Sequence, residues 1–86
     1  MNSFQQSLID RGLTKREAAV TEAALQGKTN PQIAADLNLK TPTVKYHMYN
    51  VFKTLNIKTR LSLSNLLMLE YIEFKKTQAV NSTPVE

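Results

Sequence analysis

The chain has 86 residues, with no cysteine, only two glycines and a formal net charge of +4 at pH 7. This is the length of one small domain, whose core alone gives only marginal stability. The lack of cysteine excludes disulfide scaffolds, thiolate metal sites and cysteine nucleophiles. Residues 1–12 lack the apolar core of a signal peptide, and no stretch reaches the roughly 18 apolar residues of a membrane helix, so we expect a soluble cytoplasmic protein without membrane contact.

The first residues of the chain predict either a short helix or an arm without fixed structure. Ser3 and Gln6 have the spacing of a capping box, and Gly12 can adopt the left-handed conformation that ends a helix. A helix over residues 3–11 would gather its apolar side chains on one face. We assign residues 1–12 to this arm or short helix.

A second helix is predicted over residues 15–26. Thr14 and Glu17 have the spacing of a capping box, and the segment that follows is rich in residues of high helix propensity. Gly27 is a natural left-handed residue at the end of such a helix. This helix opens the main domain, which we expect to cover residues 13–76.

Proline sets the predicted starts of the next two helices. The residue before a proline is pushed out of the helical region, whereas proline itself fits the first helical position. Asn30 before Pro31 and Thr41 before Pro42 are therefore predicted to be N-caps. The two helices then cover residues 31–37 and 42–55, with Asn38 and Asn56 as left-handed turn residues behind them.

The last helix is predicted over residues 61–76 and is apolar on two sides. The two stripes are Leu63, Leu66, Leu67 and Phe74 on one side, and Leu61, Met68 and Ile72, flanked by Leu69, on the other. Either one stripe meets a second protomer, or the core wraps further around the helix than expected. Residues 77–86 show no periodicity and are predicted to form a disordered tail.

Positive charge is concentrated where the two middle helices lie. Residues 37–69 contain no acidic side chain but five basic ones, while the charges elsewhere in the chain nearly cancel; the five are Lys40, Lys45, Lys53, Lys58 and Arg60. This asymmetry is typical of a surface that binds a polyanion, although a solvated helix face would have the same charges.

A short helix, a tight turn and a second helix with an exposed basic face match the order of a helix-turn-helix. In that motif the second helix enters the major groove of DNA with its N-terminal half. There Lys45 can donate to guanine O6 and N7, and Tyr46 and Tyr49 can contact thymine methyl groups or donate from their hydroxyls. We predict that these three side chains read bases.

Phosphate contacts are expected from donors around the same helix and from helix N-termini, whose free amides favour an anion. The predicted backbone contacts are Thr29, Asn30, Lys40, Thr41, Thr43, Asn50, Lys53, Lys58 and Arg60. If about five phosphates are neutralised, the logarithm of the binding constant should fall with the logarithm of salt concentration at a slope of roughly −4 to −5.

The stretch "LTKREAAV…QGKTNPQIAADLNLKTPTVKYHMYNVFKTLNIKTRLSL" resembles the LuxR/FixJ (GerE-type) helix-turn-helix family of bacterial transcription regulators. The likeness covers about residues 13–69 and combines four separate motifs, "LT.RE", "G.TN..IA..L", "TVK.H..N" and "L.IK.R". It implies an all-α domain of the LuxR type, with four helices and room for a short extra helix at the N-terminus. It also implies that the protein binds double-stranded DNA as a homodimer at the bacterial nucleoid.

The resemblance also implies roles for individual residues. Lys45, Tyr46 and Tyr49 fall where family members read bases, although tyrosines are not the usual choice there. The last helix is where such domains dimerise, so the implied dimer interface is Leu61, Met68, Leu69 and Ile72.

Three departures from the family pattern are visible. Lys40 stands where most members have Ser at the start of the recognition helix, and the Thr41-Pro42 pair predicts a start one residue later. Ala19 and Gln32 replace common glutamates. Many members also carry a receiver or ligand-binding domain, for which twelve preceding residues are too few, so we expect a stand-alone regulator or a fragment.

Three other functions compete with a dimeric transcription regulator. One is a sigma region 4-like promoter reader, and another is an anti-activator that sequesters a partner regulator through its last helix. An enzyme is the third, and nothing in the sequence supplies its nucleophile, acid-base pair or cofactor loop. His47 is the single histidine, so we expect it to pack or to contact phosphate, and we expect neither metal nor cofactor.

Overall fold

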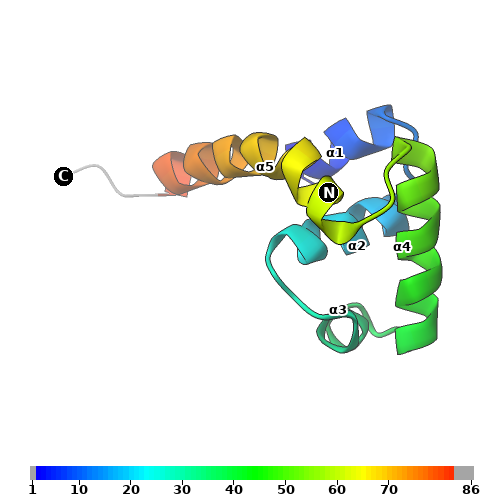
Figure 1. Ribbon diagram of the computed structural model, residues 1–86. Helices are drawn as coiled ribbons and strands as arrows, with labels where there is room; N and C mark the ends of the chain where they lie inside the picture. The colour runs from blue at the N-terminus through cyan, green and yellow to red at the C-terminus, as the bar shows by residue number, and fades with distance from the viewer. Residues whose placement is uncertain (1, 83–86) are drawn as a thin grey trace.

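The computed structural model describes the backbone of residues 2–82 and the side chains of residues 2–78 (Figure 1). Five helices and no strand form this part of the chain, which confirms the all-α prediction with its extra N-terminal helix. The helices are α1 Ser3–Asp10, α2 Lys15–Leu25, α3 Asn30–Leu37, α4 Thr41–Leu55 and α5 Arg60–Ser82. Within the same residues, no helix combines the length and the apolar character needed to cross a membrane.

The first two helices begin with side-chain caps, only one of which was assigned correctly from the sequence. The capping box of α2 is present, with Glu17 N donating to Thr14 Oγ1 at 3.1 Å and Thr14 N donating to the Glu17 carboxylate at 3.0 Å. The cap of α1 is Asn2 rather than Ser3, because Gln5 N donates to Asn2 Oδ1 at 2.7 Å. Ser3 is therefore already the first helical residue.

Both helix starts predicted from proline are one residue too late. Helix α3 begins at Asn30 behind the N-cap Thr29, and α4 begins at Thr41 behind the N-cap Lys40. Proline thus occupies the second helical position, where its missing N–H costs no intrahelical hydrogen bond. The expected displacement of the α4 start from the family pattern is absent, since Lys40 itself holds the N-cap position.

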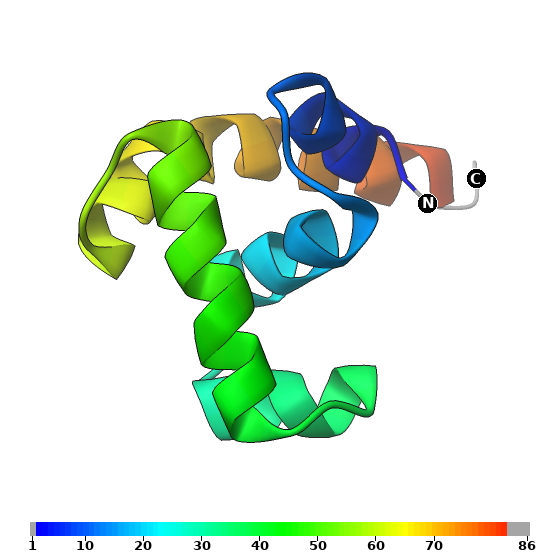
Figure 2. The same cartoon turned by 90° about the vertical axis from the view of Figure 1, so that its right-hand side faces the viewer.

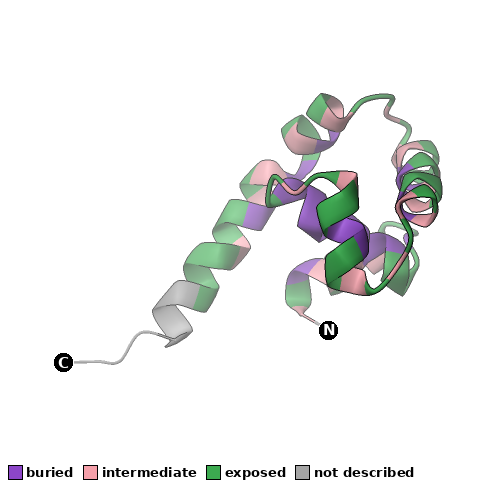
Figure 3. Cartoon of the chain, turned by 90° about the horizontal axis from the view of Figure 1, so that it is seen from below, coloured by how far each residue is buried: buried purple, intermediate pink, exposed green. Residues whose placement is uncertain are grey.

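Helix α2 is the centre of the core and contacts each of the other four helices. Its side chains are buried along nearly its whole length, and every other helix adds apolar residues to it (Figure 3). The fully buried anchors outside α2 include Leu8, Ile33, Val44, Val51, Leu63 and Leu67. Truncating one such leucine to alanine typically costs 2–5 kcal/mol, so this core accounts for much of the domain's stability.

The structure decides which stripe of α5 forms the core. Leu63 and Leu67 are fully buried and Tyr71 is 7% exposed, so the stripe that contains the two leucines faces α2. On the other side Leu61, Leu69 and Ile72 are exposed, whereas Met68 lies half-buried against the core. Leu66, which the sequence places in the same stripe as the two buried leucines, is 43% exposed.

Both ends of the described chain are helical. Of the two alternatives predicted for residues 1–12 the structure has the short helix, and α1 packs into the common core through the buried Phe4 and Leu8. Helix α5 continues to Ser82 and extends away from the other helices (Figure 1), so residues 77–82 are helical and not disordered. Residues 83–86 of the predicted tail lie outside the described residues.

Candidate nucleic-acid interface

Helices α3 and α4 are joined by a short turn that sets their relative orientation (Figure 2). Asn38 adopts the predicted left-handed conformation at φ 57° and ψ 45°. Leu39 N then donates to Ala34 O at 2.8 Å, which ends α3 and returns the chain toward the core. Asn56 ends α4 in the same way, at φ 57° and ψ 47°. The two asparagines thereby fix both ends of the α4 segment.

Helix α4 divides sharply into a buried and an exposed face. Val44, Met48 and Val51 face the core, as their helical spacing predicts. Tyr46 and Tyr49 remain 64% and 62% exposed. Lys45 is exposed beside them. The three side chains predicted to read bases therefore project together from the outer surface of α4.

Lys53 lies one turn beyond Tyr49 and interacts with its ring. The Lys53 ammonium nitrogen is 5.8 Å from the centroid of the Tyr49 ring, within the range of a cation–π contact. At an exposed site such a contact contributes about 0.5–1 kcal/mol, enough to favour one orientation of the tyrosine. The pair thus presents an aromatic face and a positive charge side by side.

A groove follows the side of α4 that faces the starts of α3 and α5. It consists of three adjoining hollows. The first and second share Asn30, Lys45 and Arg60, and the second and third share Tyr49 and Phe52. We call it the α4 groove; its polar and aromatic lining includes Lys28, Thr29, Asn30, Thr41, Lys45, Tyr49, Phe52, Lys53, Lys58 and Arg60. Among the residues that the structure describes, no acidic side chain lines this groove, so it suits an anionic ligand.

The predicted phosphate-contacting residues surround this groove but differ in how accessible they are. Thr29, Lys40, Lys53 and Lys58 are exposed, and Asn30, Thr41, Thr43, Asn50 and Arg60 are half-buried. Among the described residues, no carboxylate pairs with the ammonium groups of Lys40, Lys45, Lys53 or Lys58. These lysines are available to neutralise charge on a ligand.

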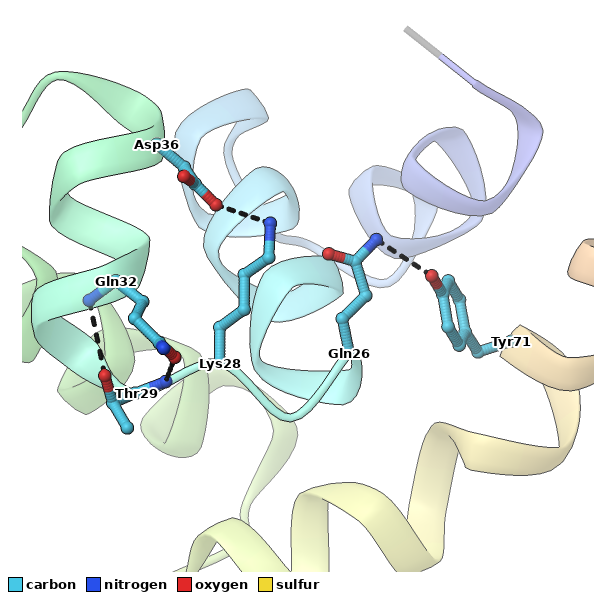
Figure 4. A network of polar contacts seen from close by, with 6 residues as sticks. All are labelled: Gln26, Lys28, Thr29, Gln32, Asp36 and Tyr71. Carbon is cyan, nitrogen blue, oxygen red and sulfur yellow. Dashed lines mark hydrogen bonds and ion pairs between the residues drawn. The ribbon is translucent and has the colours of Figure 1, made fainter.

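The loop between α2 and α3 is held by polar contacts that sequence reasoning missed (Figure 4). Thr29 and Gln32 form a capping box, with Thr29 N donating to Gln32 Oε1 at 2.8 Å and Gln32 N donating to Thr29 Oγ1 at 3.3 Å. Gln32 thus fills this position without the charge of the glutamate that is common in the family. Nearby, Lys28 is paired with Asp36.

Two residues predicted to contact DNA, Arg60 and Asn30, are also hydrogen-bonded to each other. The guanidinium of Arg60, at the start of α5, donates from Nη1 to the Lys28 carbonyl at 3.1 Å and from Nη2 to Asn30 Oδ1. The sequence did not predict this contact, because its partners lie about thirty positions apart. Arg60 also belongs to the group of basic residues that the charge distribution assigned to a surface. The start of α3 is therefore tied directly to the start of α5.

His47 is half-buried, and its ring centroid lies 6.0 Å from that of Tyr46. No group of three or more His, Cys, Asp or Glu side chains within the described residues is placed to hold a metal ion.

Taken together, the α3–turn–α4 unit and the basic, aromatic face of α4 define a helix-turn-helix domain of the DNA-binding class. The family model GerE, described as bacterial regulatory proteins of the luxR family, matches residues 11–67, and the chain belongs to this family of DNA-binding transcription regulators. The resemblance found in the sequence is thereby confirmed. Helix α1 and the outer half of α5 lie outside the matched residues.

Several curated bacterial regulators are similar to the chain. The nitrate/nitrite response regulator NarP of Escherichia coli is 39% identical over 56 residues, which cover 65% of this chain and 26% of that protein. The spore germination protein GerE of Bacillus subtilis is 42% identical over 48 residues, which cover 56% of this chain and 65% of that protein. The chain thus spans about a quarter of the length of NarP. No solved structure matches.

Proposed function

We propose that the protein is a sequence-specific transcription regulator that inserts α4 into the major groove of duplex DNA. The observation that carries this proposal is the outward projection of Lys45, Tyr46 and Tyr49 from one face of a well-anchored helix. Side chains on such a face can reach base edges, whereas the core residues opposite hold the helix at a fixed depth. The α3 start and the unpaired lysines would contact phosphates on either side.

We further propose that the protein acts as a homodimer through the exposed face of α5. Leu61 and Leu69 are 71% and 77% exposed and Ile72 is 42% exposed, on the side of the helix opposite to its core residues. Apolar side chains gathered on one helix face favour association, and a two-fold dimer would present two copies of α4 to two half-sites. The half-buried Met68 would border this interface rather than form its centre.

The same α5 face supports one competing function. It could bind the corresponding helix of another regulator, and the protein would then act as an anti-activator. The two functions differ in their DNA binding, since a sequestering protein needs no base-reading surface. The exposed Lys45 and the tyrosines beside it favour the DNA-binding homodimer.

The experiment that tests the proposal is selection of bound duplexes from a random pool at near-physiological salt. We expect enrichment of an inverted repeat whose half-sites lie about one helical turn apart. A single half-site would contradict the dimer but keep the DNA-reading function. Salt-sensitive binding without any enrichment would contradict sequence-specific reading and favour the sequestering function.

A further inference from the structure

Arg60, one of the predicted phosphate contacts, has its guanidinium engaged inside the protein. It is half-buried where the α4 groove is bordered by the starts of α3 and α5. Its Nη1 donates to the Lys28 carbonyl at 3.1 Å, and its Nη2 donates to the side-chain oxygen of Asn30. This fork bridges the α2–α3 loop and the first residue of α3.

The fork determines which atom of the Asn30 amide faces Arg60. A guanidinium carries only donors, so the Asn30 amide must turn its Oδ1 toward Arg60. The amide Nδ2, which carries two donor hydrogens, is then directed away from Arg60. Without this restraint the terminal torsion of an asparagine has a broad, roughly two-fold preference. An amide turned the other way would present an oxygen to a phosphate and repel it.

We propose that Arg60 is a positioning residue for DNA binding rather than a phosphate ligand itself. Its fork holds the start of α3 and keeps Asn30 Nδ2 outward as a donor to one phosphate beside the α4 groove. The inference rests on the proposed DNA-binding function and assigns a division of labour within that site. The direct charge contact is provided by the neighbouring Lys58. This lysine is exposed, lines the groove and pairs with no carboxylate in the described residues.

The test is a double-mutant cycle between Arg60 and Asn30 on the duplex selected by the parent protein. The variants are Arg60→Met, Asn30→Ala and the double variant, with Lys58→Met as the matched control for removal of a cation. Affinity is measured by fluorescence anisotropy at several salt concentrations, after a circular-dichroism melt confirms that each variant is folded.

We expect Arg60→Met and Asn30→Ala each to weaken binding roughly tenfold, the effect of losing one hydrogen bond to a charged group. The double variant should bind no more weakly than Arg60→Met, because both changes remove the same contact. The salt slope of Arg60→Met should match that of the parent, whereas Lys58→Met should reduce its magnitude by about 0.9.

A second variant keeps the test decisive if Arg60→Met does not fold. Arg60→Lys retains the charge but not the two-pronged geometry, so we expect it to keep the salt slope and still lose affinity. The proposal is overturned if Arg60→Lys binds like the parent, if Arg60→Met reduces the slope as Lys58→Met does, or if the two single effects add. Absence of salt-sensitive binding by the parent protein would instead overturn the proposed function, and this inference with it.

Discussion

The region around α1 and the region around α4 use their polar groups in opposite ways. Near α1, the Glu22 carboxylate accepts from Asn2 Nδ2 at 3.1 Å and from Gln5 Nε2 at 2.7 Å. Glu70 accepts from Ser7 and, at 3.2 Å, from Arg11. Around α4 the lysines point into solvent without carboxylate partners among the described residues. Charges that are satisfied internally hold helices together, and charges left over remain available to a ligand.

Aromatic side chains follow the same division. Phe4 of α1 packs against Tyr71 and Phe74 of α5, with ring centroids 5.1 Å and 6.0 Å apart. Tyr46 and Tyr49 of α4 are instead mostly exposed. The α1 region therefore serves stability, and the α4 region is expected to serve recognition. Substitutions in each region should affect one property and spare the other.

The largest effect is expected from Phe4→Ala. Removing this ring from its buried position should lower the free energy of unfolding by about 3–5 kcal/mol, because the transfer and cavity terms add. Urea denaturation measures the loss, with the exposed Tyr46→Ala as the control that should change stability little. DNA affinity, compared at a temperature where both proteins are folded, should stay the same; a weakened affinity would break the division between the regions.

A second prediction concerns the outer face of α5. Leu69→Glu and Ile72→Glu each place a charge in the proposed dimer interface, so the molar mass by light scattering should fall from dimer to monomer. Ala35→Glu puts the same charge on an exposed position of α3 and should leave the mass unchanged. If the variant that combines Leu69→Glu with Ile72→Glu still has the molar mass of a dimer, the interface lies on another surface.

Lys45→Ala sharpens the recognition side of the comparison. Loss of a bidentate contact to guanine costs about 1–3 kcal/mol, so specific affinity should fall roughly ten- to hundredfold in a titration of the selected duplex. The melting temperature should not change, because the side chain is exposed. Lys15→Ala, an exposed lysine on α2, is the control. Equal losses for the two variants would mean that charge alone, rather than position on α4, determines binding.

The smallest effect is expected at the exposed end of the α1 contacts. Glu70→Gln removes the ion pair with Arg11. The side chains of Arg11 and Glu70 are 41% and 35% exposed, so the cost in stability should not exceed about 1 kcal/mol. The control is Glu73→Gln, since the Glu73–Lys76 pair spans 3.7 Å and its side chains are 70% and 69% exposed. Thermal melts that place Glu73→Gln below Glu70→Gln in stability would contradict the role of Glu70 in fastening α1.

Sequence reasoning worked best where a structure depends on residues within about one turn of each other. The capping box of α2, the left-handed asparagines after α3 and α4, and the two faces of α4 were all predicted correctly. It failed at the starts of α3 and α4, where the restriction on a residue before proline was given too much weight. There the adjacent Thr29 and Lys40 take the N-cap position, and Asn30 and Thr41 adopt helical conformations.

The amino-acid sequence by itself determined the all-α class, the family and the segregation of basic residues, because these depend on composition, local periodicity and short motifs. Only the tertiary structure decided that α1 belongs to the core, that Leu63 and Leu67 rather than Leu61 and Leu69 face α2, and that Arg60 binds the start of α3. These outcomes depend on how helices far apart in the chain pack together. Periodicity shows that a helix has an apolar face, but only the packed neighbours decide which face is buried.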